Sequence, residues 1–110
     1  MDKLVQSSLT TIQWLKEIRF KLERRFPSLR YKESKYYAQF FSSEKNKNIV
    51  QLNPQSNQIR VFLKLVPSYD SMLQPTPSTS GYAKTYPSLL VVRDERMIEK
   101  VIELIISSYS

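Results

Sequence analysis

One strand-like segment of this sequence carries side chains suited to binding an anion. Between Gln58 and Leu65, the residues Arg60, Phe62 and Lys64 alternate with aliphatic residues. Alternate residues of a β-strand point to the same side, so one face is aliphatic and the other is basic with an aromatic ring at its centre. Basic groups pair with phosphates and rings stack on bases, so this face predicts a site for DNA or RNA, single-stranded above all.

A second segment, Tyr36 to Phe41, adds aromatic residues beside this strand. It is rich in strand formers, and either the even-numbered set that begins with Tyr36 or the odd-numbered set that begins with Tyr37 shares the face of Phe62. An exposed phenylalanine flanked by tyrosines is also typical of an interface core. The alternative is therefore a homodimer that buries this face and has no nucleic-acid role.

The residues needed for common catalytic chemistry are missing. The chain has no histidine and no cysteine, which excludes a histidine-based triad, a thiol nucleophile and the ordinary zinc and haem sites. Its single glycine excludes a glycine-rich phosphate loop. The spacing of Glu33 and Lys35 fits a metal-dependent nuclease, but that chemistry needs a further acid upstream on a neighbouring strand. We predict a protein that is not an enzyme and has no metal or cofactor.

The charge balance favours a polyanionic partner. Lysine and arginine number 17 against 10 acidic residues, a net charge of +7, and most of the surplus lies in the first half of the chain. A second candidate polyanion surface is the first helix, through Arg19, Arg24 and Arg25. On the closing segment, Glu99 and Glu103 are expected to form surface ion pairs.

Apolar residues at three- and four-residue steps predict a helix from Ser8 to Phe26, capped by Ser8 or Thr10, and a closing helix from Met97 or Ile98 to Tyr109. Four strands are expected between them, at Tyr36–Phe41, Ile49–Leu52, Gln58–Leu65 and Ser88–Val92. We therefore predict one α+β domain over residues 1–110, with two layers: an antiparallel four-stranded sheet and both terminal helices on one face. The other sheet face is left open.

The segment 67–87 holds four of the six prolines and the only glycine. A connection of this length is usually either mobile or part of a binding site. Two interpretations stay open: a bland surface loop, or a flap whose Tyr69, Tyr82 and Tyr86 contact a ligand.

The absence of cysteine fits a reducing compartment, and no stretch has the apolar character of a signal peptide or a membrane span. We expect a cytoplasmic protein without a membrane partner.

The order of these segments resembles a known family. The Asn53-Pro54-Gln55 turn, the run Ile59-Arg-Val-Phe-Leu-Lys-Leu65, Thr85-Tyr-Pro-Ser, and Leu104-Ile-Ile-Ser-Ser-Tyr109 are similar to a domain of unknown function. That domain forms the C-terminal part of bacterial and archaeal proteins described as "predicted transport protein", some with restriction-nuclease-like N-terminal regions. The resemblance spans nearly the whole chain and implies no catalytic residue. We expect this chain to differ from the family in standing alone and in its Pro/Ser-rich loop.

Overall fold

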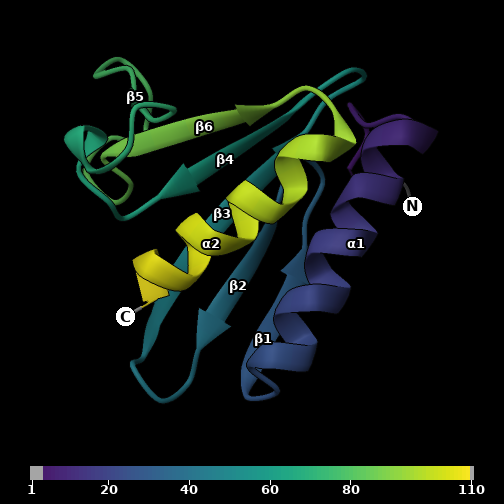
Figure 1. Cartoon of the computed structure of the whole chain (residues 1–110), viewed down its shortest axis with the longest axis horizontal. Coiled ribbons are helices and arrows are strands. Elements are labelled where there is room, and N and C mark those ends of the chain that lie inside the picture. Colours follow the sequence, from purple (N-terminus) through teal and green to yellow (C-terminus); the bar gives the residue numbers. More distant parts are fainter. Residues whose placement is uncertain (1–3, 110) are drawn as a thin grey trace.

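A helix at each end of the chain packs on one face of an antiparallel sheet (Figure 1). The computed structural model describes residues 4–109. The sheet has six strands in the order β1-β2-β3-β4-β6-β5, and all neighbouring strands are antiparallel. The α+β class and the terminal helices are thus confirmed, whereas the prediction of four strands was wrong.

Helix α1 spans Leu9–Arg25. Ser8 caps it reciprocally with Thr11: the Ser8 hydroxyl accepts from the Thr11 N–H at 3.2 Å, and the Thr11 hydroxyl accepts from the Ser8 N–H at 2.9 Å. This satisfies a backbone donor of the first turn, which has no partner within the helix. Leu15, Ile18 and Leu22 lie in its buried stripe. The predicted range Ser8–Phe26 exceeds the helix only by its two capping residues, and of the two predicted N-caps, Ser8 is the one present.

Helix α2 spans Ile98–Tyr109 and follows a short 3₁₀ turn, η2, at Glu95–Met97. The Ser108 hydroxyl joins it to the sheet, because it accepts from the Lys64 N–H at 3.0 Å and donates to the Ile49 carbonyl at 3.4 Å. Ile102, which the sequence pattern assigns to the apolar stripe, is only half-buried. The buried stripe is instead Ile98, Val101, Leu104, Ile105 and Ser108.

The strands are β1 Leu29–Glu33, β2 Ala38–Ser42, β3 Lys47–Pro54, β4 Ile59–Leu63, β5 Gln74–Pro75 and β6 Ser88–Val92. Only β6 has the predicted bounds. Tyr36 and Tyr37 precede β2, so the predicted start of that strand was two residues early. The third predicted strand extended one residue before β4 and two beyond it.

Strand β1 was missed because its alternation is hidden by charge. Leu29 and Tyr31 point toward the helices: Leu29 belongs to the buried core, and Tyr31 packs against it. Arg30 and Lys32 are exposed on the other side of the strand. A strand at the edge of a sheet tolerates such charged residues, since they discourage pairing with other chains.

The long segment between β4 and β6 folds around the end of the sheet (Figure 1). It begins with the turn η1, Pro67–Tyr69, and its short strand β5 pairs with the edge of β6. The Tyr69 hydroxyl donates to Ser107 at 3.0 Å, and Asp70 pairs with Lys100 at 2.6 Å, so α2 holds its first part.

Its later part buries apolar surface. Leu73, Thr76 and Tyr86 are at most 7% exposed. This segment is therefore partly packed into the buried clusters of the domain.

Candidate binding face

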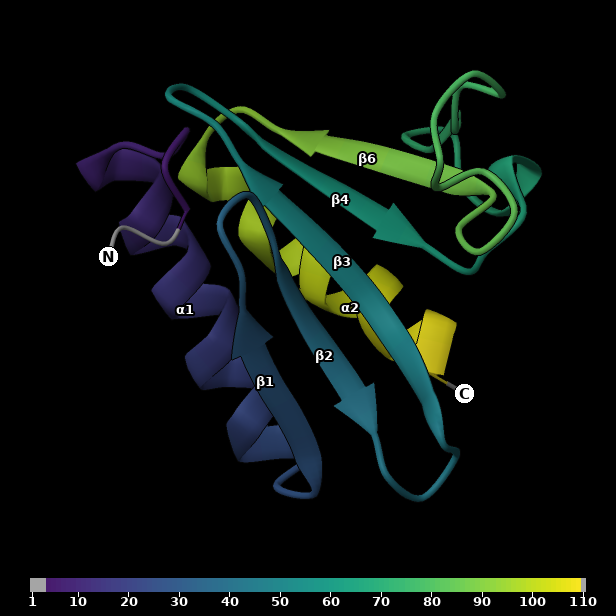
Figure 2. The same cartoon turned by 180° about the vertical axis from the view of Figure 1, so that it is seen from behind.

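The sheet face turned away from the helices is the candidate binding surface (Figure 2). The strand register sets its side chains in three cross-strand rows: Arg30, Phe41 and Asn48; Lys32, Gln39, Gln51, Phe62 and Leu89; and Asn53, Arg60 and Val91. These rows contain three basic residues and no carboxylate. An anion on this face would therefore meet positive charge without an opposing acid in the same rows.

Three amide side chains form a ladder across the middle strands. The Gln39 amide donates to the Gln51 carbonyl at 3.2 Å, and the Gln51 amide donates to the Asn53 carbonyl at 3.1 Å. These bonds leave the Gln39 side-chain carbonyl and the Asn53 side-chain amide at the two ends of the ladder, as an acceptor and a donor. Such groups can bind the edges of bases.

A hollow of about 250 Å³ lies at the β1 end of this face, lined by Arg30, Lys32, Phe41 and Asn48. A β-bulge between β2 and β3 places Asn48 opposite Phe41, and the Phe41 ring is partly exposed. Arg30 donates to the Ser43 hydroxyl at 2.9 Å. Sequence reasoning missed the basic residues of this hollow because it missed β1; their alternation with Tyr31 was the available signal.

Phe62, the predicted aromatic centre of the face, is covered. Only 2% of its surface is exposed, because Tyr82 and Tyr86 pack over it with ring centroids 4.7 and 6.4 Å away. Leu89 and Val91 complete this small cluster. The prediction of an exposed Phe62 is wrong because the 67–87 segment folds back over β4. The alternative of a dimer that buries this face was based on an exposed Phe62, so this observation no longer supports it.

Lys64 also turns toward this covering segment. Its Nζ lies 3.5 Å from the Thr85 carbonyl and 5.2 Å from the Tyr86 ring centroid. Burial, with a smaller effect from Lys47, lowers the pKa of Lys64. Arg60, in contrast, is exposed, so only one of the three predicted strand residues is freely accessible on this face.

The two tyrosines before β2 differ in exposure. Tyr37 is half-buried and has the odd parity of Gln39, which fixes the parity that the sequence left open. The pKa of Tyr86 is raised to about 12, mainly by burial and to a smaller extent by the charge of the nearby Tyr37 side chain. Tyr36 is 46% exposed, and Lys35 lies 5.5 Å from its ring.

The arginines of α1 lie on the helix layer and do not join Arg60. Arg19 pairs with Glu23 at 3.0 Å, and its guanidinium lies 3.9 Å from the Tyr31 ring centroid. The Arg24 guanidinium lies over the Phe20 ring, and the Arg25 guanidinium lies over the ring of Phe26, the residue that follows the helix. Arg24 and Arg25 therefore lie apart from the sheet face, whereas Arg19 lines a hollow of about 370 Å³ at the β1 edge together with Tyr31, Lys32 and Glu33.

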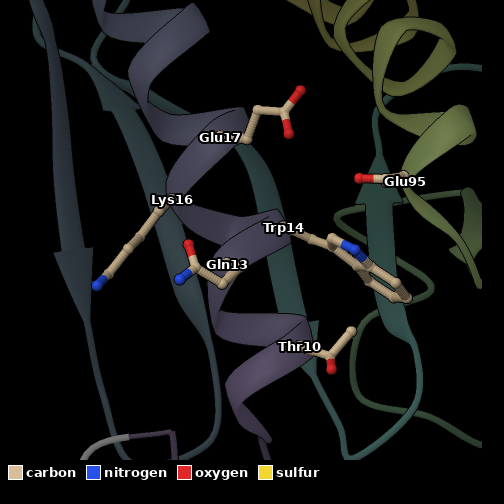
Figure 3. Close-up of a pocket in the computed structure, with 6 residues that line it drawn as sticks. All are labelled: Thr10, Gln13, Trp14, Lys16, Glu17 and Glu95. Atoms are coloured by element: carbon tan, nitrogen blue, oxygen red, sulfur yellow. The ribbon is translucent and has the colours of Figure 1, made fainter.

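A hollow of about 580 Å³ lies between α1 and η2. Figure 3 shows the Trp14 indole pointing toward Glu95, whereas Lys16 points to the other side of the helix. Trp14 is partly buried and packs against the core.

The Glu33-Ser34-Lys35 motif lacks the partners of a metal site. Glu33 accepts a hydrogen bond from the Tyr31 hydroxyl at 2.6 Å. Within residues 4–109, no group of three or more histidine, cysteine, aspartate or glutamate residues could hold a metal ion. Asp2, one of the three acids upstream, lies outside the described residues.

In the part of the chain that the structure describes, no helix combines the length and apolar character needed to cross a membrane. Comparison with known proteins identifies no relative: no protein-family model, curated protein or solved structure matches the chain. The resemblance to the transport-protein domain stays a prediction, and the functional argument depends on the geometry of the sheet face.

Proposed function

We propose that this protein is a non-enzymatic module that binds single-stranded nucleic acid on the uncovered part of its sheet face, between β1 and Arg60. The observation that carries the proposal is the charge of this face. Arg30, Lys32 and Arg60 each lie in one of the three cross-strand rows, and none of these rows contains a carboxylate. The amide ladder and the hollow beside Phe41 lie between these basic residues.

Each kind of side chain has a distinct role in this proposal. Lys32 and Arg60 lie on strands separated by three strand spacings, about 14 Å, and would pair with phosphates along one strand of nucleic acid. The partly exposed Phe41 offers a stacking surface for a base, while Gln39 and Asn53 offer polar groups to base edges. A duplex hides its base faces, so single strands should bind more tightly.

Fluorescence anisotropy with labelled single- and double-stranded oligonucleotides tests the proposal. If three basic residues pair with phosphates, the logarithm of the affinity should fall with the logarithm of salt concentration at a slope of about −2. Between 50 and 200 mM salt this corresponds to a loss of about 20-fold. An affinity that does not change with salt concentration would contradict a polyanion site.

Charge reversals locate the surface. Arg60→Glu and Arg30→Glu should each weaken binding, whereas Lys16→Glu makes the same charge change on exposed helix surface and should have a much smaller effect. Unchanged affinity in both sheet variants would reject the sheet face. Loss of binding on reversal of Arg24 or Arg25 instead would make α1 the polyanion surface.

A further inference from the structure

A groove runs between the two helices on the side away from the sheet. It has a volume of about 600 Å³ and is lined by Phe20, Lys21, Arg24 and Arg25 of α1 and by Glu99, Ile102, Glu103 and Ile106 of α2. Its apolar part includes Phe20, which is 58% exposed although it lies mid-helix. Exposed aromatic surface next to half-buried isoleucines is typical of a docking site.

The two edges of this groove have opposite charge. The α1 edge contributes Lys21, Arg24 and Arg25, and the α2 edge contributes Glu99 and Glu103. Lys21 already pairs with Glu17 and with Glu99 across the groove. Arg24 and Arg25 make no ion pair with any residue in the described range. The Arg24 guanidinium lies over the Phe20 ring, and the Arg25 guanidinium lies over the ring of Phe26, which caps the helix C-terminus.

The helices run in the same direction along the groove. Lys21 contacts Glu99 near one end, and Phe26 contacts Tyr109, with ring centroids 4.8 Å apart, near the other. At a rise of 1.5 Å per residue, Arg24 and Arg25 lie about 5–6 Å beyond Lys21, and Glu103 lies about 6 Å beyond Glu99. The basic pair on α1 is therefore level with the acid on α2.

We propose that this groove is a homodimer interface in which each α1 lies over the α2 of a second copy. A two-fold axis parallel to the groove brings the basic edge of one copy over the acidic edge of the other, at the same level. An axis across the groove would oppose basic to basic and acidic to acidic. The charge pattern selects the first arrangement, and the Phe20 side chains of both copies are buried along the axis.

A nucleic acid fits this groove less well than a second copy does. Phosphates attracted to Arg24 and Arg25 would meet Glu99 and Glu103 on the opposite edge. The dimer also leaves the open sheet face of each copy on its outer side, since the helices separate the groove from the sheet (Figure 1). This inference is independent of the proposed nucleic-acid function, because it concerns the opposite surface.

Analytical ultracentrifugation of the purified chain between 5 and 500 µM tests the proposal. A concentration-dependent dimer is expected, and Phe20→Ala should raise its dissociation constant by about 30-fold, because an exposed aromatic at the interface centre is lost from both copies. Leu9→Ala is the matched control: Leu9 is 87% exposed on the same helix but lies outside the groove. A chain that stays monomeric at 500 µM, or a dimer that Phe20→Ala leaves intact, overturns the proposal.

A charge-swap experiment tests the pairing itself. Arg24→Glu and Glu103→Arg should each weaken self-association, whereas a mixture of the two variants should recover heterodimers. Circular dichroism should show that both variants remain folded, since both positions are exposed. If the mixture associates no better than either variant alone, these two edges do not meet. If Arg24→Glu reduces oligonucleotide binding but leaves the dimer unchanged, the groove is a polyanion surface and the proposal fails.

Discussion

The Tyr82 ring lies over Phe62, with their centroids 4.7 Å apart. This contact joins a Pro/Ser-rich segment to the central part of the sheet and removes Phe62 from solvent. The segment is held from the other side by the pairing of Asp70 with Lys100 on α2. It therefore closes around the end of the sheet instead of hanging free.

We expect this packing to protect the segment from proteolysis. Limited digestion of the wild-type chain should cut slowly between Tyr69 and Lys84. Tyr82→Ala should accelerate this cleavage several-fold, because the segment then loses its contact with Phe62. Tyr36→Ala is a suitable control, since Tyr36 is exposed and lies outside the cluster. Rapid cleavage of the wild type at the same sites would contradict a packed cover.

Core and groove positions should differ sharply in their effect on stability. Leu63 is fully buried in the main core, so Leu63→Ala should lower the free energy of unfolding by about 2–5 kcal/mol. Ile102 is half-buried and lines the groove, so Ile102→Ala should cost less, about 1 kcal/mol in the monomer. Urea titrations at low protein concentration measure both values. Equal losses would show that Ile102 belongs to the core after all.

The buried Tyr86 hydroxyl should make the fold sensitive to alkali. Burial raises the pKa of Tyr86 to about 12, and its hydroxyl has no hydrogen-bond partner among the described residues. The unfolded chain loses this proton first, near its ordinary value of about 10, so stability is complete below pH 10 and falls between about pH 10 and 12. Two pKa units correspond to at most about 3 kcal/mol.

Tyr86→Phe tests this dependence directly. The substitution removes an unpartnered buried hydroxyl and keeps the ring, so we expect stability at pH 7 to be unchanged or slightly higher. Unfolding titrations from pH 8 to 11.5 should show a shallower loss than in the wild type. Some loss should remain, because burial and a hydrogen bond to Glu33 also raise the pKa of Tyr31. An identical pH profile would mean that Tyr86 ionises freely in the folded state.

The sequence predicted the elements whose periodicity is strong. Helix α1, its Ser8 cap and strand β6 follow from local patterns, and all three are present. Strand β1 was not predicted, because Arg30 and Lys32 stand between its apolar residues. A strand at the edge of a sheet tolerates such charged residues. Local patterns also cannot show which segment covers a sheet face. The parity of Phe62 was correct, but its burial depends on Tyr82, twenty residues away in sequence.

Two phenylalanines on the same sheet face should therefore respond in opposite ways. Phe41 lines the open hollow beside Arg30, whereas Phe62 lies under the loop cover. If nucleic acid binds the uncovered face, Phe41→Ala should weaken binding of single strands by about 1–3 kcal/mol, the usual value of one stacked base, with little change in salt dependence. Phe62→Ala should instead lower the free energy of unfolding by about 3–5 kcal/mol. Anisotropy titrations and urea unfolding of both variants separate the two effects, with thermal scans to confirm that the Phe41 variant is folded. If Phe41→Ala binds as tightly as the wild type, no base stacks in that hollow, and the remaining salt-dependent affinity must come from charge alone.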